Sequence, residues 1–261
     1  MYNVMKAQMY QLLRSNSTYY IFLAGLALSA MSCIFSDVTS DQINGSTWLL
    51  LVCGLLPILL PMIALIFVSG ICCGDIADKT INYEVLTGTK RSGVYFGRVV
   101  TSLIMNVLCS LVTVAVPILF MTAVKGWGHT MTVSDVALRI AAMIFPVVRL
   151  TAFFTFTAFL FKNKVALLAF GYVLTMLEMF AALLNELLDL QIFIYMFSVN
   201  ALTAIFSIEN LGFGYFDGED VQVVKDVLEM STFRTAAISG VVGTAVFLLI
   251  GYAVFRKQDM N

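Results

Sequence analysis

Six apolar runs divide this chain, each about as long as a membrane-crossing helix, and most of the charged residues lie between them. A helix needs about 20 predominantly apolar residues to cross the hydrocarbon core of a bilayer. The 261 residues are 60% hydrophobic and 12% charged, whereas soluble domains are roughly 45–50% apolar and about 25% charged. A single globular core of this length could not bury so much apolar surface. The sequence therefore predicts an all-α integral membrane protein, with residues 1–261 forming one transmembrane domain.

The apolar runs predict six transmembrane helices, and the charged residues that close most of the runs set their boundaries. The second run contains Pro57 and Pro61, four residues apart, which predict a bend on one helical face. The expected spans are residues 19–36, 47–71, 99–124, 136–161, 165–184 and 235–255.

The first 18 residues precede the first run and carry a different pattern. Met5, Met9, Leu12 and Leu13 recur at helical spacing on one side of this segment. An apolar stripe on a short segment that also carries basic residues is typical of a helix lying in the membrane interface. We therefore expect an amphipathic interfacial helix over residues 1–18.

Residues 190–208 are uncharged and long enough to cross the membrane, but they are the most polar of the apolar stretches. A crossing there would place the basic C-terminus opposite the N-terminus. We therefore interpret the stretch as a re-entrant or interfacial pair of short helices, buried against protein on the outer side. Together with the acidic stretch that follows, it makes up residues 189–232.

The lysines and arginines near the span ends fix the expected orientation. Ten of them fall on one side of a six-span arrangement and four on the other. Because the side richer in Lys and Arg faces the cytoplasm, both termini are expected to be cytoplasmic. The ten are Lys6, Arg14, Lys79, Lys90, Arg91, Arg98, Lys162, Lys164, Arg256 and Lys257, and the four are Lys125, Arg139, Lys225 and Arg234.

The sequence offers little catalytic chemistry. His129 is the one histidine, and the five cysteines lie in or beside apolar runs without CxxC spacing, which favours packing roles. No metal-site spacing, Walker motif or Gly-rich nucleotide loop is present. No basic patch supports nucleic-acid binding. We therefore expect no enzyme, no bound metal and no nucleic-acid partner.

Residues 74–98 form the one long charged stretch on the expected inner side, and they read GDIADKTINYEVLTGTKRSGVYFGR. Asp75 and Asp78 open the stretch, as acids do at a helix N-terminus. Thr87, Gly88 and Thr89 break the helix, and a second amphipathic piece is expected from Lys90 and Arg91. The stretch is either a surface loop with lipid-facing basic residues or a short docking helix for a soluble partner.

Arg139 and Arg149 interrupt the fourth expected span, and two charges lie well inside expected spans, Arg149 in the fourth and Glu178 in the fifth. These spans are antiparallel neighbours joined by a short turn, so both charges reach a similar depth. An unpaired charge in mid-bilayer costs about 2.5–3.5 kcal/mol even on the lenient insertion scale, so pairing or exposure to a cavity is expected. The pair could be a clamp between helices, part of the lining of a translocation path, or a proton relay.

Small residues mark one face of the last span. Ala236, Gly240 and Thr244 recur at four-residue spacing, with Gly243 beside them. Such faces let helices approach closely. We expect this one to pack within the chain rather than against a second subunit.

The order of these features resembles the permease subunits of type-2 ABC exporters. Those permeases typically carry an acid near the end of the second span, then a Gly/Lys-Thr-apolar step, a Leu, and a small residue followed by a basic one before the third span. Many members have Pro-apolar-Ser-Arg near the end of this stretch, where the present chain differs. The corresponding stretch here reads Asp75…Lys79-Thr80-Ile81-Asn82-Tyr83-Glu84-Val85-Leu86-Thr87-Gly88-Thr89-Lys90-Arg91.

The resemblance implies that residues 72–98 couple the chain to a separate cytoplasmic ABC ATPase dimer. ATP and Mg would be bound by that partner, so the chain itself would need no cofactor and no catalytic site. The implied coupling residues are Asp75, Asp78, Thr80, Tyr83, Glu84, Leu86, Lys90 and Arg91.

Within that family, a 261-residue chain with no fused nucleotide-binding domain is most similar to lantibiotic-immunity and peptide-export permeases of Gram-positive bacteria. This implies a multi-pass protein of the bacterial plasma membrane that forms a path with a second permease subunit, identical or paralogous. The implied cargo is an amphipathic peptide or a hydrophobic compound.

Two other functions stay open on the sequence. A secondary transporter could be driven by protons through Glu178, although intramembrane acids are scarce and no inverted repeat is detectable. A membrane scaffold or sensor subunit that transports nothing would have the same apolar pattern. Dependence on ATP separates the exporter from the first alternative, and dependence of transport on a bound ATPase separates it from the second.

Overall fold

Helices account for nearly all of the described structure, and no strand occurs among the described residues. The computed structural model describes residues 2–14, 19–20, 23, 27, 45–52, 55–74, 86, 88–128, 131–188, 197–206 and 228–257. The α-helices are α1 (Tyr2–Arg14), α3 (Gly45–Val52), α4 (Leu56–Val68), α7 (Arg91–Lys125), α8 (Val133–Phe161), α9 (Lys164–Leu188), α11 (Ser198–Phe206) and α12 (Met230–Lys257), and a π-helical turn, η1 (Ser69–Cys73), continues α4.

Five helical stretches among the described residues are long and apolar enough to cross a membrane. They correspond to the expected second to sixth spans, and the chain is accordingly a multi-pass membrane protein. The expected first span, residues 19–36, lies outside the described residues apart from four helical positions. The five stretches are Leu56–Cys73, Arg91–Lys125, Val133–Phe161, Lys164–Ala181 and Met230–Lys257.

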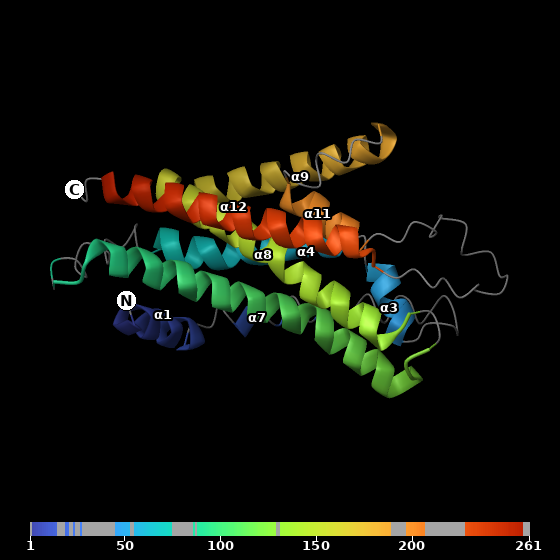
Figure 1. Cartoon of the computed structure of the whole chain (residues 1–261). Coiled ribbons are helices and arrows are strands. Elements are labelled where there is room, and N and C mark those ends of the chain that lie inside the picture. The colour runs from blue at the N-terminus through green and yellow to red at the C-terminus, as the bar shows by residue number, and fades with distance from the viewer. Residues whose placement is uncertain are drawn as a thin grey trace.

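The central helix of the bundle is α8, which contacts α4, α7, α9, α11 and α12 (Figure 1). The N- and C-terminal ends of the described chain lie at the same end of the bundle, and α3 lies at the opposite end. Two apolar clusters fill the interior. One surrounds Trp48 and Leu202, and the other surrounds Phe67, Tyr95 and Phe159.

The second span differs from its expected form. The structure separates α3 from α4, and Pro57 lies in the first turn of α4, where its missing N–H leaves no hydrogen bond unmade. Pro61 lies inside α4, which continues as a helix through it to Val68. The irregular turn comes afterwards, at η1, rather than between the two prolines.

The third span begins earlier than expected. Arg91 opens α7, so the second amphipathic piece expected from Lys90 and Arg91 is the first part of the spanning helix itself. Packing explains the continuity, because the Tyr95 hydroxyl donates a hydrogen bond to the Leu248 carbonyl of α12 at 3.0 Å. Arg98, expected to close the span, is fully buried within the helix. At the other end, Gly126 ends α7 with a positive φ of 82°, which glycine adopts without strain.

The expected N-terminal helix is present as α1 and packs against α7. Its buried residues are Val4 and Gln8, with Met9 and Leu12 packed against the apolar cluster around Tyr95. Leu13 is 54% exposed. The expected face is therefore rotated, because the neighbouring helix α7 rather than a flat interface decides which side is covered.

The small-residue face of the last span packs within the chain, as expected. A Cβ added to Gly240 would lie 2.7 Å from Cβ of Phe145 on α8, and one added to Gly243 would lie 2.8 Å from Cδ of Arg149. Glycine therefore allows α8 and α12 to approach closely. The cysteines that the structure describes, Cys72, Cys73 and Cys109, are buried in the interior, in agreement with a packing role.

Candidate functional site

The short helix α11 lies inside the bundle against four longer helices, α4, α8, α9 and α12. It has nine residues, seven of them buried, and spans about 13–14 Å at 1.5 Å per residue. This is far too short to cross a membrane. The structure therefore agrees with the expected short helix buried against protein between the last two spans, while residues 189–196 and 207–227 lie outside the described residues.

Glu178 of α9 binds the N-terminal end of α11. The Val199 N–H donates a hydrogen bond to Oε2 of Glu178 at 2.9 Å, and the carboxylate is buried. The first N–H groups of a helix have no partner within the helix, and a negative charge there is favoured by the helix dipole. Glu178 thus supplies a partner and a matching charge at once.

Arg139 of α8 binds the opposite end of the same helix. Its Nη1 donates a hydrogen bond to the Ile205 carbonyl at 2.6 Å, and the side chain is almost fully buried. The last carbonyls of a helix lack partners within it and favour a positive charge. Each end of α11 is therefore held by a buried charge of the sign that its dipole favours.

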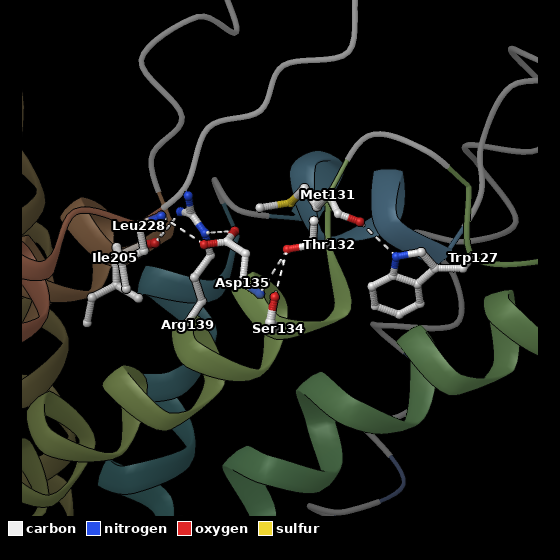
Figure 2. A network of polar contacts seen from close by, with 8 residues as sticks. All are labelled: Trp127, Met131, Thr132, Ser134, Asp135, Arg139, Ile205 and Leu228. Atoms are coloured by element: carbon white, nitrogen blue, oxygen red, sulfur yellow. Dashed lines mark hydrogen bonds and ion pairs between the residues drawn. The ribbon is translucent and has the colours of Figure 1, made fainter.

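An ion pair extends this contact to the start of α8 and the approach to α12 (Figure 2). Nε of Arg139 donates to Oδ2 of Asp135 at 2.9 Å, and the Leu228 N–H donates to Oδ1 at 2.8 Å. Thr132 caps α8, because its hydroxyl oxygen accepts from the Asp135 N–H at 3.3 Å. One buried pair thus joins three elements: the first turn of α8, the last turn of α11 and the residue two before α12.

Arg149 lies one span away from Glu178, and the two charges interact electrostatically. The Glu178 carboxylate accepts a hydrogen bond from the Val199 N–H of α11, so it interacts with the short helix as well as with the arginine. Arg149 is buried with its side chain against Gly243 of α12. The surroundings of the two charges therefore come from four helices, α8, α9, α11 and α12, and the expected pairing of Arg149 with Glu178 stays a prediction.

A row of buried polar residues on α7 was not expected. Arg98, Ser102, Asn106 and Ser110 follow one another at four-residue spacing, and each is fully buried. This spacing keeps them on one helix face. The same four-residue spacing can be read in the sequence, but the apolar residues between the four positions make it easy to overlook. Ser102 faces Cys72 of η1 at 4.0 Å between Oγ and Sγ. The row therefore lies where α7 meets η1 and α8.

Asn106 and Ser110 carry the polar atoms of this row that lack a hydrogen-bond partner. Nδ2 of Asn106 donates to Oγ1 of Thr151 at 2.6 Å, whereas Oδ1 of Asn106 and Oγ of Ser110 have no hydrogen-bond partner among the residues that the structure describes. The Thr151 hydroxyl itself donates to the Val147 carbonyl at 2.7 Å. Its oxygen must therefore accept from Asn106, which assigns the amide orientation.

The expected coupling segment is described only in part. Leu86 is 80% exposed, and Lys90 and Arg91 are exposed at the start of α7. The other expected coupling residues, which lie outside the described residues, are Asp75, Asp78, Thr80, Tyr83 and Glu84. His129 also lies outside them. The coupling segment and the buried charges around α11 lie in different parts of the sequence.

Among the described residues, no three His, Cys, Asp or Glu side chains come together in a way that could hold a metal ion. Comparison of the sequence with protein-family models gives no match, and neither does comparison with curated proteins.

Proposed function

We propose that this chain is the membrane-spanning permease subunit of an ATP-driven exporter of the type-2 ABC class. The observation that carries the proposal is the position of α11, a short buried helix placed just before the last spanning helix and held at both ends by buried charges. The N-terminal helix packed against the spanning helix α7 supports the same assignment. We further propose six spans with both termini in the cytoplasm of a bacterium.

The coupling segment, residues 72–98, connects two spanning helices directly. It begins at the end of η1 and ends within α7, so a force applied between them would reach both helices. Under this proposal, ATP-driven closure of a cytoplasmic ATPase dimer moves the segment and shifts the permease between inward- and outward-open states. Leu86 is exposed and apolar, as a contact for such a partner should be.

The proposed exporter has three further components: an ATPase, a second permease subunit and a cargo. ATP and Mg belong to the partner ATPase, and this chain contributes no catalytic site. A second permease subunit, identical or paralogous, completes the path across the membrane. The cargo is an amphipathic peptide or a hydrophobic compound, and immunity to an antimicrobial peptide is the corresponding physiological role.

The experiment that tests the proposal is gentle detergent extraction from native membranes, followed by mass spectrometry of the proteins that stay bound. We expect a stoichiometric soluble ATPase that is lost when Glu84, Leu86 and Lys90 are replaced by alanine. The control replaces Lys162, Lys164 and Val165, three exposed residues that likewise include one apolar side chain. This control should keep the ATPase.

Two outcomes would contradict the proposal. A chain that purifies alone and moves solute only under a proton gradient would favour a secondary transporter centred on Glu178, which is buried and interacts with Arg149. A chain that binds an ATPase but supports no transport in proteoliposomes would favour a scaffold or sensor subunit.

A further inference from the structure

The end of α12 and the start of α7 meet and carry four basic residues, Lys90, Arg91, Arg256 and Lys257, here called the basic rim. All four are exposed. Nη1 of Arg91 donates a hydrogen bond to the Arg256 carbonyl at 3.5 Å, which joins the two helix ends. The rim is therefore one site built from two spanning helices that are far apart in the sequence.

The charges of the basic rim repel one another. Within the part of the chain that the structure describes, none of the four forms an ion pair with an acidic side chain. The carbonyl groups at the end of α12 offset only part of this repulsion. An anion bound at the rim would lower it further, and arginine presents paired N–H donors that match the oxygens of a phosphate.

An aromatic layer lies one turn farther into the bundle. Phe96 of α7 and Tyr252 of α12 stack with ring centroids 5.5 Å apart, and both are half-buried. Tyr95 packs against both rings and holds the helices together through its hydrogen bond to Leu248. From Arg91 to Phe96 the helix rises about 7–8 Å. Aromatic rings at this depth are typical of the membrane interface.

Exposed aliphatic side chains continue the surface of α12 beyond the aromatic layer. Leu249 is 69% exposed, and Val246 and Ile250 are each 45% exposed. Along this side of α12 the chemistry therefore changes from guanidinium and ammonium groups to aromatic rings and then to aliphatic chains. A phospholipid presents the complementary order, which is phosphate, glycerol ester and acyl chain.

We infer that the basic rim and the aromatic layer form a binding site for an anionic phospholipid of the surrounding membrane. Its phosphate contacts Arg91 and Arg256, its glycerol region lies over Phe96 and Tyr252, and an acyl chain follows α12. Such binding goes beyond the proposed export function and does not depend on it. Exposed basic groups next to a spanning helix attract anionic lipid, and an arginine on each of two contacting helix ends should make this place more selective than the rest of that surface.

The turn between α8 and α9 supplies the matched control. Lys162 and Lys164 are exposed there, and Phe161 and Phe170 lie beside them with ring centroids 5.1 Å apart. This turn has two cations and an aromatic pair but no guanidinium group. Replacing both lysines by glutamine removes the same charge as replacing Arg91 and Arg256 by glutamine.

The test reconstitutes the full chain in nanodiscs of phosphatidylglycerol mixed with phosphatidylcholine and measures the lipids retained after mild detergent exchange by native mass spectrometry. We expect one tightly retained phosphatidylglycerol per chain. The R91Q/R256Q variant should retain it about twenty-five-fold less, and each single variant about five-fold less. The K162Q/K164Q control should retain it as the wild type does. The single variants keep the test decisive if the double variant does not fold.

Three results would overturn the inference. Equal losses in R91Q/R256Q and K162Q/K164Q would show general attraction to a basic surface. Equal retention of phosphatidylcholine would show that the headgroup charge is irrelevant. Displacement of the lipid by inorganic phosphate at equal concentration would show an anion site without a lipid component.

Discussion

Arg139 and Glu178 bind opposite ends of the same nine-residue helix, α11, from two different spanning helices. The guanidinium holds the Ile205 carbonyl at one end, and the carboxylate holds the Val199 N–H at the other. A helix of this length is marginal on its own. The two buried charges are therefore a principal reason that α11 keeps its place among the spanning helices, and they give the first predictions.

Replacing Arg139 by methionine should strongly destabilise the protein. The change leaves the Asp135 carboxylate buried without its counter-charge, and breaking a buried pair in this way costs about 3–5 kcal/mol. The D135N/R139M double variant should be less harmful, because no charge is then left alone. Thermal unfolding in detergent measures both. A double variant at least as unstable as R139M would show that the ion pair is not the source of the stability.

The electrostatic interaction between Arg149 and Glu178 predicts non-additive effects. Arg149→Ala and Glu178→Ala should each lower the yield of folded protein more than the double replacement does, because each single change leaves an isolated charge within the span. Fluorescence-detected gel filtration of the three variants gives the comparison. If the double variant is the worst of the three, the two charges do not compensate one another.

Glu178→Gln separates the charge of this residue from its hydrogen bond. Glutamine retains an oxygen that can accept from the Val199 N–H, whereas alanine does not. We expect Glu178→Gln to be less destabilising than Glu178→Ala by about 1–2 kcal/mol, since the N–H at the start of α11 stays paired. Equal unfolding temperatures would mean that the hydrogen bond to Val199 contributes nothing.

Gly240→Ala should weaken the contact between α8 and α12. The added Cβ would lie 3.0 Å from the carbonyl carbon and oxygen of Phe145, which are backbone atoms and cannot rotate away. Such overpacking typically costs about 1–3 kcal/mol. Gly70→Ala is the matched control, because nothing lies within 4 Å of a Cβ added there. Equal unfolding temperatures for these two variants would contradict the close approach at Gly240.

The polar row on α7 predicts that two conservative substitutions change the stability of the protein in opposite directions. Ser110→Ala removes a buried hydroxyl that has no partner and should raise stability by about 1 kcal/mol. Thr151→Val removes the acceptor of the Asn106 amide and leaves that N–H unpaired, at a cost of about 1–3 kcal/mol. Chemical unfolding of both variants in the same detergent measures the difference, and a destabilised Ser110→Ala would show that this hydroxyl has a partner.

The spanning helices could be predicted from the sequence because apolar length and the charges between runs are local properties. The ends of the fourth and last spans fall within a few residues of α8 and α12. The sequence predicted a helical piece from Lys90 and Arg91 but not its continuity with the third span, because Arg98 marks a boundary in the sequence, whereas in the structure Tyr95 binds α12 and Arg98 is buried. A charged residue marks the end of a spanning helix only where no neighbouring helix covers that residue.

Two of the buried charges, Arg149 and Glu178, were found in the sequence, but the arrangement of the buried charges was not. Arg149 and Glu178 stand out because charges within apolar runs are rare. The link from Glu178 to Val199, and from Arg139 to Ile205, depends on where α11 folds back among the other helices. The spacing of residues along the sequence does not show where α11 packs among the other helices. The row from Arg98 to Ser110 was available in the sequence, although serine and asparagine attract less notice than charges.

The π-helical turn η1 has a consequence for the segment that follows it. The Gly74 N–H donates to the Ser69 carbonyl five residues earlier, so this turn holds one residue more than an α-helical turn. A return to α-helical pairing would give that extra residue its own rise along the axis, turning the chain beyond Gly74 by about 100° and advancing it by about 1.5 Å. The two hydrogen-bond registers at the end of α4 therefore correspond to two directions in which the chain can leave this helix, with α4 itself unchanged.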